Sequence, residues 1–261
     1  MLRLRQLAVR IFSPSVRIKA KRLLFERLMR KKPLHFLHIG KTGGTAVANA
    51  FNKSFYSRDY WFMFHDHNMT LRDIPVGEAV VFFLRDPVSR YVSGFNSRLR
   101  CGKPHTFKPW HPKERTVFDE FGTANSLASA ITSQDQSERK RARKAMQSVG
   151  HVKRSLWFWF ESEEYLEERQ NDIFFIGFQE SLTNDFDMLL EALALSGLYT
   201  LTSNPVVSHR SPEDADRQLD PGSEKNIREW FSQDYECIRW CENWRSHALS
   251  RAVCANLEAL Q

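Results

Sequence analysis

A glycine-rich turn constrains this chain more than any other feature of its sequence. Residues 34–39 form an apolar, strand-like run, and residues 40–45 then read Gly-Lys-Thr-Gly-Gly-Thr. The next six residues read as the start of a helix. A strand, a glycine turn and a helix in that order point backbone N–H groups and a helix N-terminus at an anion. Lys41 adds a positive charge, and Thr42 and Thr45 add hydroxyl groups, so the stretch predicts a cradle for phosphate or sulfate.

A nucleoside-triphosphate loop is the nearest alternative interpretation of this turn. The motif G-x-x-x-x-G-K-[ST] requires a glycine five residues before the Gly of Gly-Lys-Thr. Gly40-Lys41-Thr42 is present, but the earlier position is His35, so the match is partial and the loop is shorter. An ordinary strand-to-helix turn would not need three glycines, a lysine and two threonines within six residues. We therefore favour an anion site of another kind.

The length and composition describe one folded domain. The chain has 261 residues, of which 42% are hydrophobic, with 20 Phe and 7 Trp. This hydrophobic content is enough for the core of a large α/β domain and is higher than that of a disordered chain. The net charge of +7 is unevenly placed, because residues 1–32 hold eleven Lys or Arg against the single acid Glu26. That segment carries +10 and residues 33–261 carry −3, so the basic pI does not predict a nucleic-acid partner.

The basic segment 1–32 reads as an amphipathic helix that is interrupted near Pro14. Two interpretations stay open. The helix packs on the body with a solvated basic face, or it attaches peripherally to an anionic membrane surface. We divide the chain into this basic N-terminal helical segment and one domain over residues 33–261.

The cysteines and the hydropathy pattern predict a cytoplasmic setting. Cys237 and Cys241 lie four residues apart on a predicted helix, which is a poor geometry for a disulfide. No C-x-x-C pair occurs, which disfavours a structural zinc site, and we expect reduced thiols. The sequence has no run of about 18 apolar residues, which is the length that a membrane-spanning helix needs.

Two further apolar runs predict strands that are buried in a parallel sheet. Residues 79–84 are all apolar, and residues 172–177 form a similar run after one Asp. Arg85 follows the first run, and Asp86 then stands as a helix cap before Pro87, which suits a first helical turn. With helical patterns elsewhere, these runs predict an α/β, P-loop-like three-layer fold with a central, mainly parallel sheet flanked by helices.

Two anion sites therefore follow two of the predicted strands. One is the glycine turn, and the other is Arg85, with Ser93 eight residues further along the predicted helix. Ligands of open α/β sheets bind at the carboxyl ends of the strands. Two separate anion sites predict a ligand with phosphate-like groups at both ends.

The two motifs resemble those of the sulfotransferase family. The turn at 40–45 resembles its 5′-phosphosulfate loop, and residues 85–95, Arg-Asp-Pro-Val-Ser-Arg-Tyr-Val-Ser-Gly-Phe, resemble its 3′-phosphate motif R-D-P-x-x-R-x-x-S. The likeness is strongest to the carbohydrate type, which includes the heparan sulfate 2-O- and 6-O-sulfotransferases. Its strong motifs cover residues 34–98, and a weaker likeness extends to about residue 190. The resemblance implies 3′-phosphoadenosine 5′-phosphosulfate (PAPS) as the sulfuryl donor.

The resemblance also implies a role for each motif residue. The glycine turn holds the 5′-phosphosulfate, and Arg85 with Ser93 holds the 3′-phosphate. Arg210 lies beside His209 in a late polar loop, where it either closes over the 3′-phosphate or is merely solvated. The implied donor-binding residues are Gly40, Lys41, Thr42, Gly43, Gly44, Thr45, Ala46, Arg85, Ser93 and Arg210.

Sulfuryl transfer to a hydroxyl needs a base, stabilisation of the leaving phosphate and in-line alignment. Lys41 can reach the bridging oxygen. A histidine suits the base because its pKa lies near the working pH. His67 is our choice, since its spacing to the Arg85 strand resembles the catalytic histidine region of the family, and His65 is held in reserve. The transferred group carries less charge than a phosphoryl group, so we expect no obligatory metal.

The expected reaction is in-line transfer from PAPS to a hydroxyl of a carbohydrate or small metabolite, with release of adenosine 3′,5′-bisphosphate. Two rivals remain. A nucleotide-dependent kinase would need a full NTP loop and an acidic Mg²⁺ ligand at a strand end, where this chain has Arg85 first and Asp86 as a predicted cap. A non-catalytic module would bind a nucleotide, or a membrane through residues 1–32, without turnover.

Overall fold

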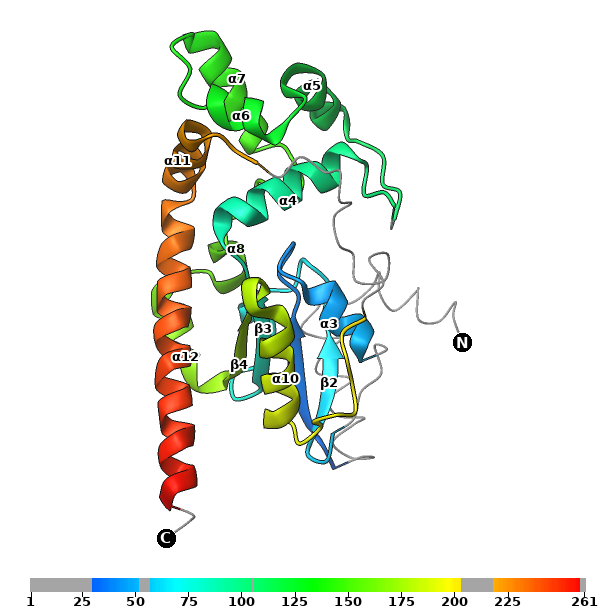
Figure 1. Cartoon of the computed structure of the whole chain (residues 1–261), viewed down its shortest axis with the longest axis vertical. Helices are drawn as coiled ribbons and strands as arrows, with labels where there is room; N and C mark the ends of the chain where they lie inside the picture. Colours follow the sequence, from blue (N-terminus) through cyan, green and yellow to red (C-terminus); the bar gives the residue numbers. More distant parts are fainter. Residues whose placement is uncertain (1–29, 52–56, 105, 203–217, 259–261) are drawn as a thin grey trace.

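The computed structural model describes residues 30–51, 57–104, 106–202 and 218–258. Within these ranges a four-stranded sheet has the order β2-β1-β3-β4, and every pair of neighbouring strands is parallel. The strands are β1 (Lys32–Leu37), β2 (Tyr60–Phe64), β3 (Ala79–Leu84) and β4 (Ile173–Phe178). The predicted fold class, a parallel α/β sheet flanked by helices, is confirmed (Figure 1).

Two details of the sheet differ from the sequence prediction. Residues 60–64, part of an aromatic stretch that the sequence left unassigned, form β2 and pair along β1 from Lys32 to Phe36. The stretch lacks polar alternation, so its strand character depends on this pairing rather than on a local pattern. In addition, β1 ends at Leu37 instead of reaching Ile39, and the glycine turn is therefore preceded by two irregular residues.

Alternate side chains of the sheet bury two separate cores. Leu37, Val80 and Phe82 face one core, which is covered by α8 (Trp157–Phe160), α9 (Glu163–Glu168) and the long α12 (Ser232–Glu258). Phe36 and Val81 face the other core, which is covered by α3 (Gly44–Ala50) and α10 (Leu182–Ala192). In Figure 1, α12 runs beside β4 on one flank of the sheet. The central strands are buried on both faces, as their continuous apolar runs predicted.

A helical layer lies above the carboxyl ends of the strands (Figure 1). Its own apolar core contains Tyr91, Phe95, Leu127 and Ile227. Pro112 and Pro221 each stand in the first turn of a helix of this layer, a position that suits proline. The layer consists of α4 (Pro87–Leu99), α5 (Pro112–Phe121), α6 (Ala124–Ala130), α7 (Gln136–Met146) and α11 (Pro221–Trp230), and three short 3₁₀ turns elsewhere are η1 (Leu71–Asp73), η2 (Gln170–Asp172) and η3 (Gln179–Ser181).

The strand order creates a switch point between β1 and β3. The chain leaves β1 for β2 on one side and leaves β3 for β4 on the other, so the connections diverge there. Crevices at such points are where open α/β sheets bind ligands. The glycine turn follows β1, and Arg85 follows β3 directly, so the fold brings both predicted anion sites to the same crevice.

The N-terminal prediction falls mostly outside the described residues. Of the basic segment 1–32, the structure describes residues 30–32, and Lys32 already belongs to β1. Arg210 and His209 also lie outside the described ranges. Across the part of the chain that is described, we find no helix that combines the length and the apolar character needed to cross a bilayer.

Candidate functional site

The glycine turn has a backbone conformation that suits close approach to a ligand. Lys41 and Gly43 both have positive φ, at 71° and 87°. The Thr42 hydroxyl donates to the Ile39 carbonyl over 3.0 Å, so this side chain braces the turn from within. A Cβ at Gly44 would lie 2.5 Å from the His38 ring, so only glycine lets that ring cover the start of α3. Thr45 lies at the same ring, with its hydroxyl 3.5 Å from His38 Nε2.

Lys41 lies in a buried and positively charged environment. Burial, together with the positive charges of Arg85 and Arg100, lowers the pKa of Lys41 to about 8. The Arg85 guanidinium also donates from Nη1 to the Lys41 carbonyl over 3.4 Å, which joins the two predicted anion sites directly. Three cations thus gather at the switch point of the sheet. Such a cluster favours an anion with more than one negative charge.

The start of α4 completes this side of the site. Asp86 caps the helix, accepting from the Ser89 amide over 2.8 Å, and it also accepts from the Tyr235 hydroxyl over 2.8 Å. The predicted cap is therefore confirmed, and both oxygens of this carboxylate are committed to protein groups. Ser93 lies two turns further along α4 and is 9% exposed. Ala46 is buried in α3, one turn beyond Gly43.

His67 lies beside this cluster in a defined protonation state. Its Nδ1 is 3.1 Å from the His38 carbonyl, and because a carbonyl can only accept, Nδ1 carries the ring proton. Nε2 is left with its lone pair. Burial is the main cause of the lowered pKa of His67, and the positive charges of Lys41 and Arg154 also contribute. The ring is therefore neutral at pH 7 and has a nitrogen that can accept a proton.

His65, the reserve candidate, faces a different set of partners. Its Nε2 lies 2.9 Å from His35 Nδ1, and His35 Nε2 lies 2.6 Å from a Glu78 carboxylate oxygen. His35 is completely buried and Glu78 is 5% exposed. The structure therefore places His65 at the end of a hydrogen-bonded chain that leads into the interior, whereas His67 lies in the electrostatic field of Lys41.

His151 belongs to the site and was missed in the sequence. It lies in the loop between α7 and α8, with Nδ1 3.9 Å from the Cβ position of Gly40 and its ring centroid 6.4 Å from that of His67. Burial and the nearby charge of Lys41 lower the pKa of His151 to about 3, so it stays neutral at working pH. No motif surrounds His151 in the sequence, and only the packing of its loop against Gly94 of α4 places it here. Arg100, just after α4, was missed for the same reason.

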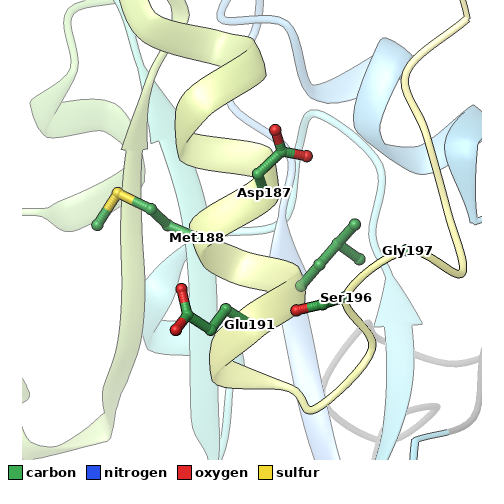
Figure 2. A pocket seen from close by; sticks show the side chains of 6 residues that line it. Asp187, Met188, Glu191, Ser196 and Gly197 are labelled. Carbon is green, nitrogen blue, oxygen red and sulfur yellow. The ribbon is translucent and has the colours of Figure 1, made fainter.

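Two other findings concern the rest of the described chain. A pocket of about 270 Å³ lies on α10 and the turn after it, and Figure 2 shows its lining side chains. None of its lining residues, Asp187, Met188, Leu190, Glu191, Ser196 and Gly197, belongs to the switch-point site. Among the described residues, no group of three or more His, Cys, Asp or Glu has an arrangement that could hold a metal ion.

Comparison with known proteins agrees with the geometry of the switch-point site. A family model described as "Sulfotransferase family" matches residues 27–238, which cover most of the chain and include every element of the site. Neither the comparison with curated proteins nor the comparison with solved structures returned a match.

Proposed function

The chain belongs to the sulfotransferase family, and from that premise we propose that it transfers a sulfuryl group from PAPS to an acceptor hydroxyl. The observation that carries the proposal is the convergence of Lys41, Arg85 and Arg100 at the switch point. Three neighbouring cations are costly without an anion between them. PAPS has the charge to compensate them, with a phosphosulfate at one end and a 3′-phosphate at the other.

The donor would bind across the two strand ends. We assign the 5′-phosphosulfate to the glycine turn, residues 40–46, where the backbone has positive φ at Lys41 and Gly43. We assign the 3′-phosphate to Arg85, just before α4, and to Ser93 within that helix. Arg210 stays a proposed contact to the 3′-phosphate and lies outside the described residues.

His67 would act as the base. Its Nε2 takes the proton of the acceptor hydroxyl while the hydroxyl oxygen bonds to sulfur. The bond between sulfur and the 5′-phosphate oxygen breaks, and the electron pair stays on adenosine 3′,5′-bisphosphate. Lys41 stabilises the charge that develops on this leaving phosphate. The lowered pKa of His67 supports the assignment, because the ring is then unprotonated and ready to accept.

The acceptor would be a hydroxyl of a carbohydrate or small metabolite, as in the heparan sulfate 2-O- and 6-O-type enzymes that the motifs resemble. We propose a cytoplasmic setting, and both interpretations of residues 1–32, packing on the body or peripheral contact with a membrane, stay open. Cys101, Cys237 and Cys241 carry free thiols in the described part of the chain, which agrees with a reducing compartment. No nucleic-acid partner is part of the proposal.

A thermal-shift experiment with adenosine 3′,5′-bisphosphate, and with ATP plus Mg²⁺ as the rival ligand, tests the donor assignment. A ligand at 100 times its dissociation constant stabilises the fold by about 2.7 kcal/mol. We expect a clear shift with the bisphosphate and a smaller one with ATP. A larger shift with ATP and Mg²⁺ would favour the kinase interpretation and contradict ours.

Turnover separates an enzyme from a binding module. Transfer of radioactive sulfate from PAPS should be measured over a panel of sugars and small hydroxylated metabolites, with and without chelator. Lys41→Ala and His67→Ala should each abolish transfer. If both variants kept full turnover, the assigned chemistry would be wrong.

A further inference from the structure

Arg90 of α4 contacts the backbone of two segments that the proposed function uses. The side chain is 3% exposed. Its Nε donates to the Gly40 carbonyl over 3.2 Å, and its Nη2 donates to the Arg154 carbonyl over 2.7 Å. Asp234 of α12 lies 3.5 Å from Nη1 and balances the buried charge. One guanidinium therefore joins the first residue of the glycine turn to the loop before α8.

That loop in turn holds His67. The Arg154 side chain donates to the His67 carbonyl over 2.9 Å and to the Asn68 side chain over 2.8 Å. The Trp159 indole donates to the same His67 carbonyl over 3.1 Å. The Arg90 guanidinium lies 5.2 Å from the centroid of the Trp159 ring, within the range of a cation–π contact. Both residues that hold the His67 carbonyl therefore contact Arg90, Arg154 through its backbone carbonyl and Trp159 through its ring.

We propose that Arg90 is a positioning residue that sets the distance between the donor-binding turn and the base. The inference rests on the proposed function, because it concerns the alignment of Lys41 and His67. These two residues follow different strands, β1 and β2, and their side chains come from irregular segments that the sheet does not align. A planar guanidinium can hold two carbonyls and a carboxylate at once in a fixed geometry, whereas a lysine ammonium cannot.

The decisive variant is Arg90→Lys, which keeps the charge and removes the fork. The matched control is Arg98→Lys on the same helix. Arg98 is also buried, and its guanidinium also bonds a carboxylate and two carbonyls, those of Glu114, Lys108 and Pro109. These bonds lie away from the turn and from His67. The two variants therefore lose comparable interactions at different places.

The direct readout is the imidazole ¹⁵N–¹H spectrum of His67, assigned by comparison with His67→Asn. The wild-type protein should show a protected Nδ1–H, because this proton is bonded to the His38 carbonyl. Arg90→Lys should shift or abolish that signal, and Arg98→Lys should leave it in place. We also expect Arg90→Lys to weaken adenosine 3′,5′-bisphosphate binding about tenfold and to lower kcat about 100-fold.

Arg154→Ala keeps the test decisive if Arg90→Lys fails to fold, because Arg154 is only partly buried. It should reproduce the change at His67 while bisphosphate affinity stays within about twofold, since Arg90 still holds Gly40. An unchanged His67 signal in both variants, or an equal change in Arg98→Lys, would overturn the inference. Failure of the wild-type protein to bind the bisphosphate would instead refute the proposed function, and the spectra would still report on the coupling.

Discussion

Proton uptake on donor binding follows from the pKa of Lys41. In the free protein this pKa is about 8, lowered by burial and by the charges of Arg85 and Arg100. A bound anion at the cluster would offset that repulsion and return the pKa to about 10.5 or above. The free protein at pH 9 would then hold about 0.1 proton on Lys41, and the complex would hold nearly one.

Isothermal titration calorimetry with adenosine 3′,5′-bisphosphate, in buffers of different ionisation enthalpy, measures this uptake. We expect about 0.9 proton per site at pH 9 and about 0.1 at pH 7, because Lys41 is already charged at the lower pH. Affinity should change little below pH 8 and fall about tenfold per pH unit from there to pH 10.

The control is Lys41→Met, which should bind more weakly and lose the difference in proton uptake between pH 7 and pH 9. Equal uptake at the two pH values in the wild-type protein would refute the reasoning. So would a variant that kept the wild-type uptake, because the proton would then bind elsewhere.

Three further predictions concern single residues. His67→Asn should lower kcat by about 10²- to 10⁴-fold and leave bisphosphate affinity nearly unchanged, since a base acts on the acceptor hydroxyl. Steady-state kinetics would measure kcat and calorimetry the affinity, and a large loss of affinity would contradict the prediction. Arg85→Ala should reduce the preference for adenosine 3′,5′-bisphosphate over adenosine 5′-monophosphate about tenfold or more in competition binding, whereas an unchanged preference would place the 3′-phosphate elsewhere. Glu114→Gln should lower the free energy of unfolding at pH 7 by about 3 kcal/mol in urea titrations, because it breaks the buried pair with Arg98. Burial opposes ionisation of Glu114, but hydrogen bonds from Arg98, His111 and Gly150 outweigh it and lower the pKa of Glu114 to about 2. The wild-type protein should therefore lose the stability that ionised Glu114 contributes as the pH falls from about 4.5 to 2. The variant should show no such loss.

Local features of the sequence predicted the parts of the site that lie within single segments. The glycine turn, the apolar run of β3 and the Asp86 cap each depend on residues a few positions apart, and each appears where it was expected. Placement of both predicted anion sites at strand ends followed from the same local patterns. The general rule that parallel α/β sheets bind ligands at the carboxyl ends of their strands then predicted that the two sites lie at the same edge of the sheet.

These local patterns did not predict which distant segments of the chain contact one another. β2 is a strand because it pairs with β1, and its aromatic sequence alone has no strand period. His65 and His67 are two residues apart and look alike in the sequence. Their difference arises because one ring bonds His35 and the other bonds the His38 carbonyl.

The sequence by itself determined the fold class, the glycine turn and the family, because these depend on short motifs and on the order of apolar runs. Only the tertiary structure decided which partners the rings of His65 and His67 have, that Arg100 and His151 join the site, and that Arg90 spans the turn and the loop that holds His67. The physical reason is that hydrogen bonds, burial and charge act over a few ångströms in space, between residues that are tens of positions apart along the chain.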